Sequence, residues 1–533
     1  MKRLDFAGGV FLTGREGAAM LVDPPSPRFT DLDQQIFRAL VPRDHYLRRA
    51  LARIPWDDFH KLLAPYYCAD QWRPAESPVL MLKLEFLRYH YNLSDRQVIG
   101  QAETDVAFRY FLQLNLRAPL PDPSSLCLFR GRLGVQGFRD VFERVVAQAR
   151  EQGLVRDRLR LKDATHIIAN VAIPTTLALV AQARDKLLAA AEPFDALRVA
   201  GERVNIELLR QSSAGRSDEE RLVARVTHLR EILLWADELA PPEQAADDRA
   251  WRDLQRARQL AHRVLSDQDD PRSGDRLRSL ADPDVRRNKH GDWYDGYLLD
   301  ILVDADSQII TQINVLPANG DEAADAVALL HQEEQAHGHD IEALSMDGAG
   351  FNGPLLRTLQ DPEGLAIEAY VPPRAEPATQ TFTPKDFVEN AENGTVTCPA
   401  GKTSRYRERD SKQRSWIFRF QRRTCEGCAL LARCMSHPPK GTFGKTVRKS
   451  DYEVEYQRVR AKARTAEYAA VRAEHAAVER KLGEVMNRHG GRRARSRGLP
   501  RVLMQQLMTT TTTNVKRIVH LLCAPPAALA VAT

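Results

Sequence analysis

The stretch DRLRLKDATHIIANVAI, residues 157–173, decides the fold of this chain. Apolar and polar positions alternate around Leu159, Leu161 and Asp163, which is typical of a β-strand, and we expect this strand to end near the aspartate. Downstream, residues 295–318 hold two β-rich runs on either side of DADSQ, a pattern that predicts a hairpin. An amphipathic helix and two short strands follow, within residues 319–338, 340–353 and 365–373. This order predicts an α/β core, a mixed sheet flanked by helices.

A helical N-terminal domain is expected over residues 30–155, because apolar residues recur there at three- and four-residue spacing. Ser94 is a predicted N-cap, and Ser124 or Ser125 is expected to cap the helix that holds LCLFRGRLG. Exposed Arg130 and Arg132 on short helices favour a helix-turn-helix-like unit that binds DNA. A small dimerisation or scaffolding bundle is the alternative.

Four further segments are expected after the N-terminal domain. Residues 156–175 and 281–375 form the first part of the core, and a helical insertion at 176–280 separates them. Residues 376–450 form an Arg-rich insertion with four cysteines. Residues 451–522 supply the C-terminal core helices and a basic segment.

The composition agrees with a multidomain protein that binds nucleic acid. The chain has 533 residues, too many for one ordinary core, and a net charge of +6. Arginines cluster at 405–423 and 488–497, while 317–347 is acidic; an ordinary mixed surface is the alternative reading of this pattern. Seven cysteines, an odd count, argue against a secreted disulfide scaffold and for a reducing cytoplasm.

No membrane association is expected from the sequence. No run of eighteen apolar residues exists, so we expect no membrane span. Near the N-terminus, Arg15 and Glu16 interrupt a short apolar run, and we therefore expect no signal peptide.

Two aspartates are candidate ligands of a divalent metal. Asp163 and Asp347 each stand where a predicted strand ends, and active sites of α/β sheets gather at such ends. Carboxylates there can hold Mg²⁺ or Mn²⁺, and a pair of ions can activate a water or a 3′-hydroxyl for attack at phosphorus. A third carboxylate from a helix would complete the set. The alternative is that both aspartates only form turns at strand ends.

That third carboxylate is sought in VRAEHAAVERKLGEVMNRHGGRRARSRG, residues 471–498. On a helical wheel, Val471, Val478, Leu482 and Val485 form one apolar stripe. Glu479 lies at one border of the stripe and Glu474 at the other, whereas Glu484 points to the opposite, solvent side. The wheel excludes Glu484 and leaves Glu479 and Glu474 open.

Four cysteines form a candidate zinc site in the Arg-rich insertion. One CxxC pair and two outlying thiols can saturate a tetrahedral ion; unliganded thiols or an unusual disulfide are the alternatives. The residues are Cys398, Cys425, Cys428 and Cys434.

Arginines beyond the glutamate helix are expected to contact DNA phosphates, and Gly490 and Gly491 allow the backbone to turn towards them. These arginines are Arg488, Arg492, Arg493, Arg495 and Arg497.

Several ordered segments across residues 40–520 resemble the DDE transposases of bacterial insertion sequences. SPVLMLKLEFLRYHYNLSDRQV resembles their N-terminal helical domain, LKDATHIIANVA the strand of the first aspartate and SMDGAGFNG the turn of the second. VERKLGEVMNRHGGRRARSRG and TTTTTNVKRI resemble the glutamate helix and the C-terminal end. Such transposases often carry a similar CPxG…CxxC…C segment before the glutamate.

The resemblance implies a ribonuclease H-like core, the acidic triad Asp163, Asp347 and Glu479, and use of Mg²⁺ or Mn²⁺. It also implies binding of double-stranded DNA at the element ends, cleavage, joining of 3′-hydroxyl ends to target DNA, and a homodimer on DNA in the bacterial nucleoid. Related transposases often place Tyr, Arg, Glu and Lys around the glutamate. In that register this chain has Arg472, His475, Glu479 and Met486. Arg472 and His475 are therefore candidate DNA contacts.

Overall fold

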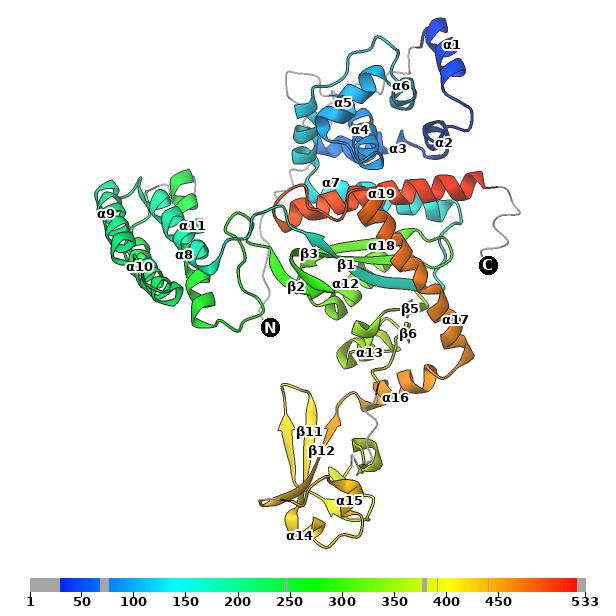
Figure 1. Cartoon of the computed structure of the whole chain (residues 1–533). Helices are drawn as coiled ribbons and strands as arrows, with labels where there is room; N and C mark the ends of the chain where they lie inside the picture. Colours follow the sequence, from blue (N-terminus) through cyan, green and yellow to red (C-terminus); the bar gives the residue numbers. More distant parts are fainter. Residues whose placement is uncertain are drawn as a thin grey trace.

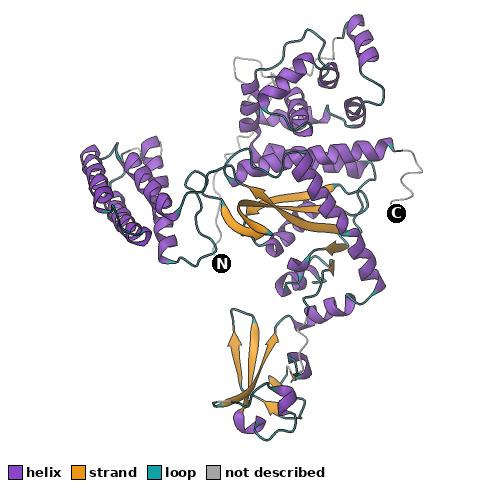
Figure 2. Cartoon of the chain, viewed as in Figure 1, coloured by secondary structure: helices purple, strands orange, loops and turns teal. Residues whose placement is uncertain are grey.

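The structure is a computed structural model that describes residues 29–524, apart from 68–75, 244, 246–247, 376–380, 391 and 440. It is a mixed α/β protein, with a six-stranded sheet preceded by a helical region (Figure 1), and helices surround the central strands (Figure 2). The predicted class is confirmed at this level. No helix in the described part of the chain is long and apolar enough to cross a membrane. The N-terminal run around Arg15 lies outside the described residues.

The N-terminal region is helical, and its helices begin at residues that can cap them. Thr30 and Asp33 form a capping box at the start of α1. Ser94 and Gln97 form another at α5, which confirms the predicted N-cap at Ser94. The helices are α1 (Asp31–Leu40), α2 (Tyr46–Arg53), α3 (Asp58–Leu63), η1 (Ala64–Tyr66), α4 (Pro78–His90), α5 (Asp95–Thr104), α6 (Val106–Leu112) and α7 (Pro123–Glu151).

The start of α7 differs from the prediction. Asp122 is the N-cap instead of Ser124 or Ser125, because its carboxylate accepts the Ser124 N–H at 2.8 Å. Pro123 then takes the first helical position, where its missing N–H costs nothing. Gly134, with φ 57° and ψ −162°, divides α7 into two pieces joined at a kink.

The sheet is centred on β1 (Arg160–Ile168). β1 pairs with the antiparallel β3 (Asp292–Asp304) along its whole length and with the parallel β5 (Ala343–Ser345) on its other side. The remaining strands are β2 (Arg286–His290) and β4 (Ile310–Pro317), both antiparallel to β3, and β6 (Glu368–Tyr370), parallel to β5. β3 and β4 form the predicted hairpin. The hairpin of β2 and β3, which turns at Gly291 with φ 72°, is one that the sequence pattern does not predict.

Alternation along the strands gives the sheet two apolar faces. One face, which includes Leu161 and Ile301, shares a core with α7, α18 (Ala476–Arg488) and α19 (Leu499–Cys523). The other, which includes Leu302, packs against α12 (Glu322–His337) and α13 (Gly353–Leu359). Figure 1 shows α19 between the sheet and the N-terminal helices.

The run MTTTTTN forms a buried turn of α19. Thr509 and Thr513 are fully buried, and each hydroxyl donates to the carbonyl four residues earlier, which satisfies its polar group inside the helix. Asn514 bonds both the N–H and the carbonyl of Ile310 at the start of β4. This polar run therefore fixes α19 to the sheet.

A helical unit follows β1 and has an apolar core of its own, centred on residues such as Val180, Leu229 and Leu254. It lies to one side of the sheet in Figure 1. Its helices are α8 (Thr176–Ala191), α9 (Ala196–Ser212), α10 (Asp218–Glu238) and α11 (Arg249–Asp269).

The described residues within 381–450 form two three-stranded sheets around the small apolar cluster of Phe387, Val396 and Phe418. α16 (Glu453–Lys462) and α17 (Ala466–Glu474) then lead back to the central sheet. The elements are η3 (Pro384–Asp386), β7 (Val388–Asn390), β8 (Thr395–Thr397), β9 (Thr403–Ser404), β10 (Arg407–Asp410), β11 (Ser415–Gln421), α14 (Arg422–Cys425), α15 (Leu431–Cys434) and β12 (Phe443–Ser450).

Candidate acidic active site

Asp163 lies on β1, and Asp347 lies two residues beyond the end of β5, the strand that pairs with β1. In the parallel pair of β1 and β5, Leu161 is opposite Ser345. Each aspartate follows two residues later in the same direction, and paired strands are only about 4.8 Å apart. Asp347 caps the short helix η2 (Gly348–Gly350), because its Oδ1 accepts the Ala349 N–H at 2.9 Å. The register therefore brings the two carboxylates together.

The alternation predicted that β1 would end near Asp163, but the strand is longer. It continues to Ile168, and Asp163 stands opposite Ile301 in the middle of the strand. The strand continues because β3 offers a partner to every residue of β1 and Ile167 is fully buried beneath the helices. Asp163 thus shares the sheet face of Leu161 and Ile301, the face that α18 covers.

The helix predicted through the glutamate run is two helices joined at His475. His475 is 4% exposed, and its Nδ1 lies 3.1 Å from the Ser345 hydroxyl. Arg472 donates to the same hydroxyl at 3.1 Å and to the Met346 carbonyl at 2.6 Å. Both side chains therefore hold the joint against the strand that leads to Asp347. The buried His475 does not face solvent, which contradicts the DNA contact predicted for it.

The three glutamates of this run have different surroundings. Glu479 is exposed on the first turn of α18, and no cation among the described residues pairs with it. Glu474 forms a bidentate ion pair with Arg158, at 3.2 and 2.7 Å. Glu484 was predicted on the solvent side, but it is half-buried and pairs with Lys516 at 2.7 Å, because α19 covers that side. Glu479 is thus the glutamate with a free carboxylate.

The acids influence one another electrostatically. Burial raises the pKa of Asp163 to about 6, and the charges of Asp347, Glu479 and Glu322 act in the same direction. Burial also raises the pKa of Glu322, where Lys162 opposes the shift and Asp347 adds to it. Asp163 is therefore coupled electrostatically to Asp347, Glu479 and Glu322, and these four acids are called the acidic cluster below.

Glu322 was not among the predicted site residues. It is the first residue of α12, directly after the N-cap Asp321. Acids in a first helical turn are ordinary, since they complement the helix dipole, and this position gave no signal of a site. What brings Glu322 to the cluster is the packing of α12 and η2 under the sheet.

The carboxylates of this cluster are of the kind that binds divalent cations. Lys162 is adjacent to Asp163 in sequence, but it points to the opposite face and pairs with the buried Asp300 at 2.8 Å. No lysine or arginine among the described residues forms an ion pair with Asp163, Asp347 or Glu479, whereas the positive charge of Lys162 acts on Glu322. Oxygen ligands without such a partner are those that Mg²⁺ and Mn²⁺ prefer.

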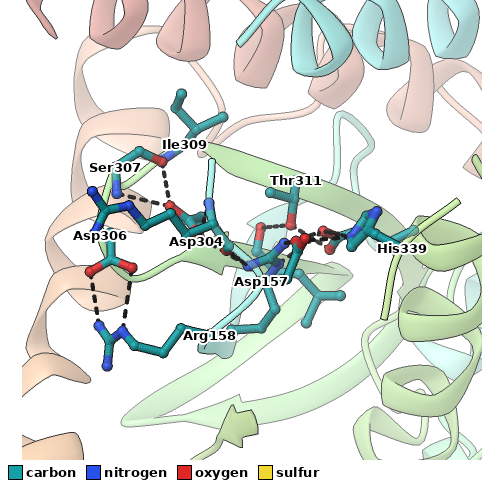
Figure 3. Close-up of polar contacts among 12 residues, drawn as sticks. Asp157, Arg158, Asp304, Asp306, Ser307, Ile309, Thr311 and His339 are labelled. Atoms are coloured by element: carbon teal, nitrogen blue, oxygen red, sulfur yellow. Dashed lines mark hydrogen bonds and ion pairs between the residues drawn. The ribbon is translucent and has the colours of Figure 1, made fainter. Parts of the chain in front are cut away.

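Among the described residues, metal-ligand spacing is found at Asp157, Glu333 and His339, whose ligand atoms lie within 4.8 Å of one another; the acids around Asp163 are not so closely spaced. Arg160 contacts Asp157 and Glu333 at 2.8 Å each, and Arg150 contacts the same two acids at 3.0 Å each. Two guanidinium groups therefore already neutralise the acids, and a cation would have to displace them. This group, part of the network in Figure 3, is an ion-pair network and not a metal site.

The basic segment after α18 lies against the end of β1. Arg492 donates to the His166 carbonyl at 2.6 Å, and its own carbonyl accepts the Ile168 N–H. Arg495 lies 4.7 Å above the ring of Tyr89, on α4. Arg492 and Arg495 thus hold the segment in place. The arginines with exposed side chains are Arg488, Arg493 and Arg497.

Arg130 was predicted to be exposed, but its side chain is largely buried. Its guanidinium lies between Glu85 and Asp95, at 2.5 Å from each, and ties α7 to α4 and α5. Arg132 is exposed and lies 4.3 Å above the ring of Tyr67. Of this pair, Arg132 alone has the exposure expected of a phosphate contact.

The four predicted zinc ligands line one small cavity of about 30 Å³ between the two smaller sheets. All four thiols are free, so the disulfide alternative is wrong. Burial raises the pKa of Cys434, and the other three cysteines act in the same direction, while Lys445 opposes them. The Lys445 N–H also donates to the Cys425 sulfur at 3.5 Å. Four thiols around one cavity form a donor set that suits Zn²⁺. They are Cys398, Cys425, Cys428 and Cys434.

Two segments match transposase families. Residues 35–132 match a transposase domain (DUF772), and residues 397–519 match a transposase DDE domain. The second match contains the four cysteines and Glu479.

A curated relative and the solved structures add little to these matches. The chain is 27% identical over 135 residues to an uncharacterized protein, ORF8 in the nfe locus, of Rhizobium meliloti. This match covers 25% of the chain and 64% of that relative's length. No solved structure matches the chain.

Proposed function

Since the chain carries the domains of an insertion-sequence DDE transposase, we propose that it moves its own element. It binds the inverted-repeat ends, cleaves the DNA there by metal-dependent hydrolysis and joins the 3′-hydroxyl ends to target DNA. The observation that supports the proposal is the electrostatic influence of Asp347 and Glu479 on Asp163, three acids that come from separate segments of the chain. Water and a 3′-hydroxyl both attack phosphorus in line, so one acidic site serves both steps.

The core of this proposal is ribonuclease H-like. The strand order β4, β3, β1, β5, β6, with β3 antiparallel to β1, supports it. We divide the chain into domains accordingly. Residues 30–155 form the domain that binds DNA or dimerises. Residues 156–175 and 281–375 form the first part of the core, and residues 176–280 are an insertion between them. Residues 376–450 form the Cys-rich insertion, and 451–522 complete the core.

Asp163, Asp347 and Glu479 would hold Mg²⁺ or Mn²⁺. Such ions, when bound, activate the attacking oxygen and stabilise the leaving oxygen. The chain itself sets the position of the acids. The Ala349 N–H orients Asp347, and the contact of His475 with Ser345 holds the first turn of α18 beside β5. Glu322 is a further carboxylate near the same point.

DNA would follow the exposed arginines near this site. Arg493 pairs with Ile168 at the end of β1, five residues beyond Asp163, and Arg488 and Arg497 are exposed on the same basic segment. Their charges suit phosphates, which supply most of the affinity of proteins for DNA. Two element ends must be held together for joining, and we therefore expect a homodimer on DNA.

Two alternative functions would give different reaction products. A regulator derived from an inactive transposase would bind the ends without cutting them; the departures at Arg472, His475 and Met486 favour this candidate. A nuclease with the same core would cut without joining. Incubation with Mg²⁺, the element's ends and a target plasmid separates the three. We expect cut ends and joined products, whereas a gel shift without cleavage would exclude the transposase.

The acidic cluster makes a prediction about stability without metal. The folded-state pKa of Asp163, about 6, lies above the ordinary 3.8, so its contribution to stability is present below pH 3.8 and lost as pH rises through 6. In metal-free protein, Asp163→Asn should therefore raise the melting temperature at pH 8 and leave it unchanged near pH 3.5.

Adding Mg²⁺ at pH 8 should raise the melting temperature of the wild-type protein but not that of Asp163→Asn, because the ion binds the folded state alone. Differential scanning calorimetry with and without EDTA measures both effects. Equal Mg²⁺ shifts in the two proteins would speak against the site.

The four cysteines are proposed to bind a structural Zn²⁺. We expect the purified chain to hold one zinc per molecule by atomic emission and to lose it in Cys428→Ser. The exposed Cys127, on α7, gives the matched control Cys127→Ser, which should keep its zinc. Zinc absent from the wild-type protein purified without chelator would refute this assignment.

A further inference from the structure

A second cavity, of about 380 Å³, lies outside the acidic site, between α8, α9 and α10 of the helical unit. Five of the side chains that line it are arginines, and neither aspartate nor glutamate is among its lining residues. The arginines are Arg184, Arg210, Arg216, Arg221 and Arg225.

Two of these arginines form no close ion pair with a carboxylate among the described residues, although the charge of Arg216 acts on Glu220. Arg216 is exposed in the turn before α10. Arg225 is half-buried on α10 and makes one hydrogen bond, from Nη1 to the Leu177 carbonyl at 2.9 Å. The other three pair with acids of their own helices: Arg184 with Asp185, Arg210 with Glu207 and Arg221 with Asp218. The cavity therefore has guanidinium donors that the chain itself leaves unused.

The basic character of this cavity does not follow from the composition around it. Over residues 176–280, acidic residues slightly outnumber basic ones. The first turn of α10 is itself acidic, but Asp218 is held by Arg221 and Glu220 caps the helix with Ser217. Neither acid lines the cavity. The arginines thus gather on one side of a unit whose other charges are mostly negative.

We propose that this cavity binds a phosphate group. Its volume lies in the range of ligand sites, about 300–1,000 Å³, and it is larger than a single phosphate needs. Guanidinium groups bind phosphate oxygens with short, charge-assisted hydrogen bonds, and a bidentate geometry suits them. Ile206 and Leu209 add an apolar wall, on which the remainder of a nucleotide would rest. The phosphate comes from the DNA backbone or from a free phosphate compound.

The test uses the full chain without Mg²⁺, and pyrophosphate as the first probe. We expect calorimetry to detect saturable binding. Arg216→Gln together with Arg225→Gln should weaken it at least about tenfold, which corresponds to about 1.4 kcal/mol. Arg256→Gln is the matched control, because Arg256 is an exposed arginine of α11 outside the cavity. Arg216→Gln alone, at an exposed position, repeats the test if the double variant unfolds.

A DNA duplex of the element's end is the second probe. Loss of a backbone contact should lower the slope of log affinity against log salt by roughly one per phosphate. A lowered slope identifies DNA as the source of the phosphate, and weakened pyrophosphate binding with an unchanged slope identifies a free phosphate compound. The proposal is overturned if the cavity variants match Arg256→Gln with both probes. The DNA measurement rests on the proposed function, whereas the pyrophosphate measurement does not. A failure of the cavity proposal can therefore be distinguished from a failure of the proposed function.

Discussion

Replacing Asp163 by Asn should abolish strand cleavage and joining while DNA binding stays within about twofold of wild type. Asp163 is the acid at the centre of the cluster, on the strand that pairs with both β3 and β5. Loss of about 4 kcal/mol of transition-state stabilisation would slow both steps about a thousandfold. Asp347→Asn and Glu479→Gln should have the same effect. Cleavage of labelled element ends in Mg²⁺, with a parallel gel shift, measures it.

Glu474→Gln is the matched control for this series. Glu474 is the competing glutamate of the same run, and its carboxylate pairs with Arg158. We expect this variant to retain cleavage within about threefold of wild type. Full activity in Glu479→Gln together with loss in Glu474→Gln would transfer the catalytic role to Glu474.

Replacing Arg160 by Met should destabilise the fold by about 3–5 kcal/mol at pH 7, since it leaves buried carboxylates without their cation. Arg160 is fully buried and contacts Asp304 at 2.9 Å and Glu333 at 2.8 Å, and both acids are fully buried. Figure 3 shows the neighbouring Asp304 and Asp157. Burial alone would raise the pKa of Glu333, but Arg160, His339 and Thr311 lower it to about 2.

The lowered pKa of Glu333 makes the stability of the fold depend on pH. The ordinary pKa of Glu333 is 4.5, so its contribution to stability is present above pH 4.5 and is lost as the pH falls towards 2. The penalty of Arg160→Met should shrink over the same range. Melting temperatures from pH 7 to pH 3 measure it.

Arg158→Met is the control for this stability prediction. Arg158 is the neighbouring arginine, half-exposed, and pairs with Asp306 and Glu474 at the surface. Exposed ion pairs contribute about 0–1 kcal/mol. Equal losses of stability in the two variants would contradict the role assigned to the buried network.

Much of the secondary structure followed from local patterns. The periodicity of α12, the β-rich runs of β3 and β4, and the Ser94 cap are signals carried by a few adjacent residues. These elements satisfy their hydrogen bonds locally or with a neighbour in sequence. Their form was therefore predictable before any tertiary contact was known.

The errors arose where distant segments decide the local structure. β1 passes through Asp163 because β3, more than a hundred residues later, pairs with it. Arg130 is held by Glu85 and Asp95, and Glu484 by Lys516, partners that no wheel or spacing reveals. Glu322 joins the acidic cluster through the placement of a whole helix. Residue types indicated the chemistry of the site, but its full membership required the tertiary structure.

The most direct test of the shared acidic site is the location of a bound metal. Crystals of the protein grown or soaked with Mn²⁺ should give an anomalous scattering peak in contact with the carboxylates of Asp163 and Asp347, and no peak in crystals of Asp163→Asn. A peak between Asp157, Glu333 and His339 instead, or none near Asp163, would contradict the account.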